Sequence, residues 1–223
     1  MAKPPKFADV SSEYWKLFLE CRVNSDKLAE VQQIATSISL NRPRYQTVTT
    51  GLGSMPWWFV ALIHSLEGGL SFTTHLHNGD SLTARTKHVP AGRPVANPAA
   101  NPKQAPSATN PYTWEESATD ALRQKGLNAW TDWSIVGSLY QLEAYNGWGY
   151  RMYHPKVLSP YLWSYTNHYT KGKYASDGKW DANLVSAQAG AAAILRVLVD
   201  NGVVAATDYR GDFPTPKAGV GYA

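Results

Sequence analysis

The stretch that most constrains the fold is an apolar run that ends in one carboxylate and two glycines. It reads WWFVALIHSLEGG over residues 57–69, and Ser54 and Pro56 stand just before it as helix-start residues. A helix of this composition is apolar on almost every side, so we expect it to be the central, buried helix of the fold. Gly68 and Gly69 end it.

Glu67, at the end of this helix, is a candidate general acid. The negative end of the helix dipole disfavours a carboxylate there, and burial among apolar neighbours would disfavour the charged form further. Both effects predict a raised pKa, and a carboxyl group that is protonated at neutral pH can donate a proton to a leaving group. The structural alternative is that Glu67 turns outward to solvent or pairs with an arginine.

The segment after the helix predicts a small β-hairpin. Asn78-Gly79 is a strong hairpin-turn signal, and it lies between strands expected at 71–77 and 82–89. Asp80 follows the turn, and a hairpin aspartate that faces a helix-end glutamate would supply the pair of carboxylates that glycoside hydrolysis uses. Asp80 could equally be a plain turn residue, because Asn-Gly-Asp is good turn chemistry.

Three histidines offer a rival site, a zinc centre. His64 lies three residues before Glu67 and shares its helix face, and His75 and His77 alternate onto one face of a strand. Together with Asp80 they could bind zinc in a wall-cleaving peptidase, although neither of the long zinc-peptidase signatures is present. The structural alternative is that one histidine orients a neighbour and another is exposed.

The remainder of the chain predicts a mainly α (α+β) protein with a single domain over residues 1–223. Helical patterns with caps or stops predict helices at 12–23, 25–38, 113–126, 131–147, 159–172 and 181–202, and turn signals predict a loop at 41–55. We expect a Pro-rich loop at 89–111 and a loose tail at 205–223.

Charge and composition limit the classes of partner. The formal net charge is +4, and the basic residues are scattered, which argues against a nucleic-acid surface and favours the anionic polymers of a bacterial envelope. Cys21 is the only cysteine, so no intramolecular disulfide can form. The chain shows neither an apolar signal-peptide segment nor the about 20 apolar residues that span a bilayer, so we expect a protein made in the cytoplasm without stable membrane insertion.

A ring-rich segment suggests a sugar-binding surface. QLEAYNGWGYR, at 141–151, places Tyr145, Trp148 and Tyr150 around a helix stop that needs only Asn-Gly, with Glu143 and Arg151 on either side. Aromatic side chains combine an apolar face with a polar group and suit a sugar ring. The alternative is that these rings belong to an aromatic core.

Taken together, these motifs resemble the lysozyme-like superfamily. AYNG, at 144–147, resembles a turn of soluble lytic transglycosylases and goose-type lysozymes, in which the tyrosine lies near the catalytic glutamate and the asparagine helps to bind sugar. The order Glu…Asp-x5-Thr resembles the triad of phage lysozymes and matches Glu67, Asp80 and Thr86, with a longer gap between the first two. Over about residues 56–190 the chain is similar to phage-type endolysins and bacterial wall hydrolases.

This resemblance implies a lysozyme-like helical domain with a small β-hairpin next to the catalytic helix. It implies a muramidase, a glycoside hydrolase that cuts the β-1,4 bond between N-acetylmuramic acid and N-acetylglucosamine without a cofactor. Glu67 would be the general acid, and Asp80, with Thr86 beside it, would hold water or stabilise the cation. The substrate-binding residues would be Tyr145, Asn146, Trp148, Tyr150, Arg151, His77 and Tyr165.

The implied biology is that of a bacteriolytic, antimicrobial phage endolysin. We expect a monomer that binds the peptidoglycan glycan strand and no nucleic acid, and that reaches the wall, from the periplasm or the exterior, after release. Three alternatives stay open: lytic transglycosylase chemistry on the same bond, a zinc-dependent wall endopeptidase that uses His64, His75 and His77, and a module that binds glycan without cutting it.

Overall fold

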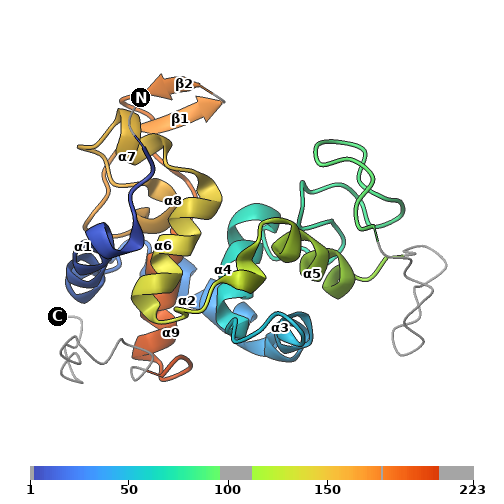
Figure 1. The fold of residues 1–223 in the computed structure, drawn as a ribbon. Helices are drawn as coiled ribbons and strands as arrows, with labels where there is room; N and C mark the ends of the chain where they lie inside the picture. Colours follow the sequence, from blue (N-terminus) through green and yellow to red (C-terminus); the bar gives the residue numbers. More distant parts are fainter. Residues whose placement is uncertain (1–2, 96–111, 177, 206–223) are drawn as a thin grey trace. The chain divides into compact units, whose positions relative to one another are not determined.

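The computed structural model describes residues 3–95, 112–176 and 178–205, and this part of the chain is mainly helical (Figure 1). Its helices are α1 (Phe7–Glu20), α2 (Leu28–Leu40), α3 (Arg42–Thr49), α4 (Trp57–Gly68), α5 (Trp114–Gln124), the 3-10 helix η2 (Leu127–Ala129), α6 (Ile135–Asn146), α7 (Gly149–Tyr153), α8 (Pro160–Trp163) and α9 (Ala191–Asp200). Strand β1 (Lys173–Ser176) pairs antiparallel with β2 (Lys179–Asp181). The α+β class is therefore confirmed. Most of the predicted loop at 89–111 and of the predicted tail at 205–223 lies outside the described residues.

The chain divides into two compact units. Unit 1 contains residues 1–35 and 132–223, and unit 2 contains residues 36–131, so that one boundary falls inside α2. Each unit has its own buried apolar residues. The single domain over residues 1–223 stays a prediction.

Helix α4 is the buried helix of unit 2, as its sequence predicts. Its residues from Trp58 to Ser65 are all buried, and α3 packs against both α4 and α5. Helix α5 begins at the predicted capping box, in which Thr113 and Glu116 bind each other's backbone N–H groups. Although α4 is so apolar, no helix in the described ranges has the length and apolarity needed to cross a membrane.

Helix α3 occupies residues for which the sequence predicts a loop, and that prediction is wrong. Pro43 stands at the start of the helix, a favourable position, and Tyr45 and Val48 share one face and are fully buried. Two apolar residues in eight are too few to show a helical period in the sequence. The helix is stabilised by packing on α4 and α5 rather than by its own propensity.

The core of unit 1 is formed by α1, α6, α8 and α9. Helix α9 buries Ala191, Ala192 and Ala193 at its start, and its first residues approach α8 closely. Gly190, just before α9, donates its N–H to the carbonyl oxygen of Ser164 at 3.0 Å. A Cβ atom at Gly190 would lie 2.4 Å from the carbonyl oxygen of Leu162, so only glycine fits this contact.

The β-hairpin predicted at 71–89 is wrong. This segment contains one isolated antiparallel bridge, between Thr74 and Ser81, and the two-stranded sheet lies instead at 173–181 in unit 1. Around this bridge His75 and Leu82 donate their N–H groups to the carbonyl oxygens of Asp80 and Thr73, but the N–H groups farther along the predicted second strand do not continue a ladder. Those of Lys87 and His88 are bound by the side chain of Asp80.

Two predicted helices are much shorter than expected. The helix predicted at 159–172 is confirmed only over Pro160–Trp163, because Tyr165 adopts a left-handed conformation with φ 67°. The helix predicted at 181–202 is confirmed only over Ala191–Asp200. The carboxylate of Asp181 instead binds the N–H groups of Asn183 and Leu184 and forms a turn.

Gly190→Ala should destabilise unit 1. The added methyl group would overlap backbone atoms of α8, which cannot rotate away, and such overpacking costs about 1–3 kcal/mol or more. Urea denaturation should show a lower midpoint with an unchanged m-value. Gly149→Ala is the matched control, since a Cβ atom there meets only the ring of Tyr174, at an ordinary 3.6 Å. Equal midpoints for the two variants would contradict the packing of α9 on α8.

Candidate functional site

Glu67 lies in the last turn of α4 and is exposed. The prediction that apolar neighbours bury this carboxyl group is therefore wrong, because burial of the helix stops at Ser65. Gly69 caps the helix in a left-handed conformation and donates its N–H to the carbonyl oxygen of His64. The candidate acid is thus held at the solvent-facing end of an otherwise buried helix.

His64 is fully buried one turn before Glu67, and both of its ring nitrogens have partners. Nε2 lies 3.0 Å from the carbonyl oxygen of Ser71, and Nδ1 lies 3.1 Å from the hydroxyl group of Tyr45. Because a carbonyl oxygen can only accept, Nε2 carries the proton, and Nδ1 accepts from Tyr45. Burial lowers the pKa of His64 to about 4, so the ring is neutral at pH 7.

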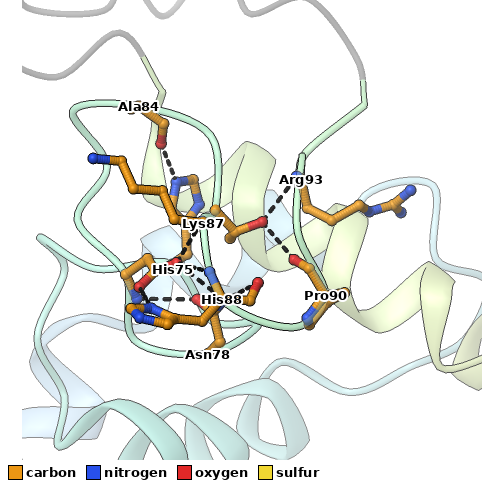
Figure 2. Close-up of polar contacts among 9 residues, drawn as sticks. His75, Asn78, Ala84, Lys87, His88, Pro90 and Arg93 are labelled. Carbon is orange, nitrogen blue, oxygen red and sulfur yellow. Dashed lines mark hydrogen bonds and ion pairs between the residues drawn. The ribbon is translucent and has the colours of Figure 1, made fainter.

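Asp80 binds its own loop with both carboxylate oxygens, and its partners Asn78, Lys87 and His88 are labelled in Figure 2. Oδ2 accepts the backbone N–H groups of Lys87 at 2.7 Å and His88 at 3.0 Å, and the side-chain amide of Asn78 at 3.2 Å. Oδ1 accepts the ring Nδ1–H of His88 at 2.6 Å. Hydrogen bonds from His88 and Lys87 hold the pKa of Asp80 well below its usual range. The carboxylate therefore serves as the anchor of a turn.

Thr86 closes the next turn of the same loop and is 3% exposed. Its hydroxyl group donates to the carbonyl oxygen of Pro90 at 2.5 Å and accepts the N–H of Arg93 at 2.9 Å (Figure 2). The backbone N–H of Thr86 also donates to the carbonyl oxygen of Arg93 at 2.8 Å. Thr86 is predicted to lie beside Asp80 in a catalytic site. The structure instead buries Thr86, and these hydrogen bonds lie within residues 86–93.

His77 joins this loop to α5. Its Nε2–H donates to Asp120 at 2.9 Å, its Nδ1 lies 3.3 Å from the hydroxyl group of Ser117, and its side chain is 1% exposed. Arg93 pairs with the same carboxylate, with Nη2 2.8 Å from Asp120 Oδ1. Burial lowers the pKa of His77. His77, predicted to bind substrate, is thus part of the interior.

Ser117, His77 and Asp120 have the composition of a nucleophilic triad, although the sequence shows no motif that joins His77 to the other two. Their arrangement is nevertheless structural. His75 donates Nε2–H to the carbonyl oxygen of Ala84 at 2.7 Å, so its Nδ1 accepts the single hydroxyl proton of Ser117, at 2.8 Å. That proton is not directed at His77, and Ser117 is fully buried, so no substrate can reach it.

The zinc site considered from the sequence does not form. The ring nitrogens of His64, His75 and His77, and both oxygens of Asp80, are directed at protein partners. Across the described ranges, no group of three or more His, Cys, Asp or Glu side chains is placed to hold a metal ion. The geometry therefore gives the endopeptidase alternative no support.

The predicted sugar-binding residues of the ring-rich segment belong to unit 1. Tyr145 and Trp148 are half-buried, and the ring of Trp148 lies 5.1 Å from that of Tyr140. Asn146, the last residue of α6, is exposed, and its amide lies 3.5 Å from the hydroxyl group of Ser159. These three side chains keep surface that a ligand can contact.

Three residues that are predicted to bind substrate instead pack or pair within unit 1, namely Tyr150, Arg151 and Tyr165. Tyr150 is 6% exposed and packs against the rings of β1 and β2, and Tyr165, which is 7% exposed, donates its hydroxyl proton to a backbone carbonyl. The guanidinium of Arg151 lies over the ring of Tyr14 and is bound by two carboxylates.

Glu143 is a buried acidic residue for which the sequence pattern predicts no catalytic or binding role. It is 2% exposed, and it accepts hydrogen bonds from the hydroxyl group of Tyr14 and from Arg151 Nε, at 3.0 Å. Arg151 Nη1 also reaches Glu13 at 2.9 Å, so the cluster links α1, α6 and α7. Burial raises the pKa of Glu143. Its position at the turn, eight residues before Arg151, is the signal that could have revealed this pair.

Comparison of the chain with protein-family models, with curated proteins and with solved structures finds no match. A function for this chain therefore has to be inferred from its own residues and their geometry.

Asp80→Asn should loosen the loop at 78–88 and leave α4 intact. A neutral amide oxygen accepts weaker hydrogen bonds than a carboxylate, so the N–H groups of Lys87 and His88 should exchange faster with solvent. The same loosening should appear in the parent protein as the pH falls below the usual aspartate pKa of 3.8, because the folded state binds this proton less tightly than the unfolded chain. Hydrogen exchange measures both effects, with the exposed Asp26→Asn as control. Unchanged exchange at Lys87 and His88 would contradict the anchoring role.

Proposed function

We propose that this protein is a peptidoglycan-cleaving muramidase with a lysozyme-like fold, in which Glu67 is the general acid. The observation that carries this proposal is the position of Glu67. It is an exposed carboxyl group in the last turn of a helix whose residues from Trp58 to Ser65 are buried. A buried helix is a rigid support, and its solvent-facing end is accessible to a polymeric substrate.

In the proposed reaction, Glu67 donates its proton to the oxygen that joins N-acetylmuramic acid to N-acetylglucosamine. The bond between C1 of the muramic acid and that oxygen breaks as the ring gains oxocarbenium character, and water then adds to C1 and returns a proton to the Glu67 carboxylate. A sugar chain that lies over the exposed carboxyl group excludes water from it, and the less polar surroundings favour the protonated form. Asp80 and Thr86 support the loop that follows α4 and transfer no proton. The reaction needs no cofactor.

Tyr145, Asn146 and Trp148 are the proposed sugar contacts of unit 1. The two rings offer apolar faces to a sugar, and the Asn146 amide can both donate and accept hydrogen bonds. His77, Tyr150, Arg151 and Tyr165 are left out of this set because they are buried or paired within the protein.

The proposed partner is the glycan strand of the bacterial wall, and the proposed setting is that of a monomeric phage-type endolysin that acts on the wall after release. The net charge of +4 favours attraction to the anionic groups of that wall. Bacteriolytic activity would follow from cleavage of the glycan.

The bonding of Asp80 favours lytic transglycosylase chemistry as a second candidate. Hydrolysis by a pair of carboxylates needs the second one to activate water or to stabilise the cation, whereas both oxygens of Asp80 bind the loop. In the alternative, the C6 hydroxyl group of the same muramic acid attacks C1 and returns its proton to Glu67. One carboxylate is then sufficient.

Glu67→Gln should abolish wall lysis and leave the fold intact. The amide keeps the size of the side chain but cannot donate the proton, and loss of such a group costs about 10²–10⁴-fold in rate. Turbidity of purified wall measures lysis, and thermal unfolding measures the fold. Glu20→Gln is the control, because Glu20 is also an exposed glutamate at a helix end. A Glu67→Gln protein that lyses wall at the parent rate would contradict the assignment of the acid.

The products distinguish the two reactions. Hydrolysis should release muropeptides with a reducing N-acetylmuramic acid, and the transglycosylase reaction should release a 1,6-anhydro product that is one water lighter. Mass spectrometry of a complete digest, with an enzyme of each known type run in parallel, decides between them. Release of free peptides with uncut glycan would contradict both.

A further inference from the structure

The chain reverses direction immediately after Glu67, and the reversal is built on His64. The carbonyl oxygen of His64 accepts the N–H groups of Gly69 and of Leu70, the latter at 3.3 Å. Gly69 and Leu70 have φ values of 53° and 62°. This left-handed conformation is unfavourable for leucine, so surrounding contacts must hold it.

The side chain of His64 closes the same turn. Its Nε2–H donates to the carbonyl oxygen of Ser71 at 3.0 Å, which joins the two ends of residues 64–71 with Glu67 between them. The ring also lies against Gly68, where an added Cβ atom would come within 3.0 Å of it. Two kinds of hydrogen bond therefore hold the last turn of α4: backbone bonds to the carbonyl oxygen of His64, and the bond from the His64 side chain to Ser71.

The ring of His64 is itself held in place within unit 2. Tyr45 donates to Nδ1, and the rings of Phe72 and Trp114 lie 4.6 and 4.3 Å from the His64 ring. The Arg44 guanidinium lies 3.7 Å from the Phe72 ring and pairs with Glu115. Contacts with α3, α5 and the following loop thus restrain the imidazole.

We infer that His64 is a positioning residue for Glu67, and this inference rests on the proposed role of Glu67 as the acid. The terminal turn of a helix ordinarily frays, and Glu67 is the penultimate residue of α4. The hydrogen bond from His64 to Ser71 prevents fraying and directs the Glu67 carboxyl group toward the substrate oxygen. His64 does not touch the substrate.

The test compares variants that keep or remove the donor at the position of Nε2. His64→Leu removes it, whereas His64→Gln retains an amide N–H that can reach Ser71. We expect kcat on soluble glycan strands to fall about 10²-fold in His64→Leu with KM little changed, because a small misplacement of an acid has an effect of that size. His64→Gln should recover most of kcat.

A matched control separates positioning from loss of a buried histidine. His75 is also buried in unit 2 and also donates Nε2–H to a backbone carbonyl, that of Ala84, but it is not part of α4. His75→Leu should lower the melting temperature and leave kcat of the folded protein unchanged. Hydrogen exchange at Leu70 and Ser71 should accelerate in His64→Leu and not in His75→Leu.

The outcomes distinguish this inference from the proposed function. Parent-like kcat in His64→Leu, with Glu67→Gln inactive, overturns the positioning role and leaves the muramidase proposal standing. Equal losses of kcat in His64→Leu, His64→Gln and His75→Leu also overturn it, because the effect would then be structural. Parent-like activity in Glu67→Gln overturns both. A loss in His64→Leu that His64→Gln restores, with unaltered kcat in His75→Leu, supports it.

Discussion

Burial of α4 on all sides is the constraint on which unit 2 depends. A helix with eight successive buried residues has no face left for solvent, so neighbouring elements have to cover it, among them α3, Trp114 of α5 and Phe72 of the following chain. Two of those residues, His64 and Ser65, are polar, and burial of the His64 ring requires partners for both of its nitrogens. Tyr45 and Ser71 supply them, and the need for Ser71 draws the chain back over the helix end. Glu67 lies within this turn and is exposed.

The loop after α4 also needs hydrogen-bond partners for its polar groups, and no strand within its described residues supplies them. A long loop against a core has backbone N–H and carbonyl groups that need partners, and here side chains supply many of them. Asp80 binds two N–H groups and Thr86 binds one, while His75 and His77 connect the loop to α5. Such a network is specific, because one missing partner would leave a buried polar group unsatisfied.

The charged residues that stabilise the fold limit the choice of catalytic groups. In unit 2, the carboxylate of Asp80 stabilises a turn, and in unit 1 the pair of Glu143 and Arg151 links three helices. Residue types that suggest catalysis in the sequence are therefore used for folding in both units. Because both oxygens of Asp80 bind their own loop, the proposed chemistry uses Glu67, exposed in the last turn of α4, as its single acid, and formation of an anhydro-sugar is the alternative to hydrolysis.

Local sequence signals determined the elements whose apolar pattern, start and stop lie within a few residues of each other. The apolar run and the glycine stop predict α4, and the Thr113–Glu116 capping box predicts the start of α5, because periodicity and caps act within a few residues. Tertiary contacts alone decided that α3 is a helix, that the segment after Asn78-Gly79 is not a hairpin, and that Glu67 is exposed. The physical reason is that an aspartate, threonine or histidine suits a turn, a buried network or an active site equally well. Whether such a residue joins a turn, a network or an active site depends on the partners that packing brings to it, and the neighbouring residues in the sequence do not identify those partners.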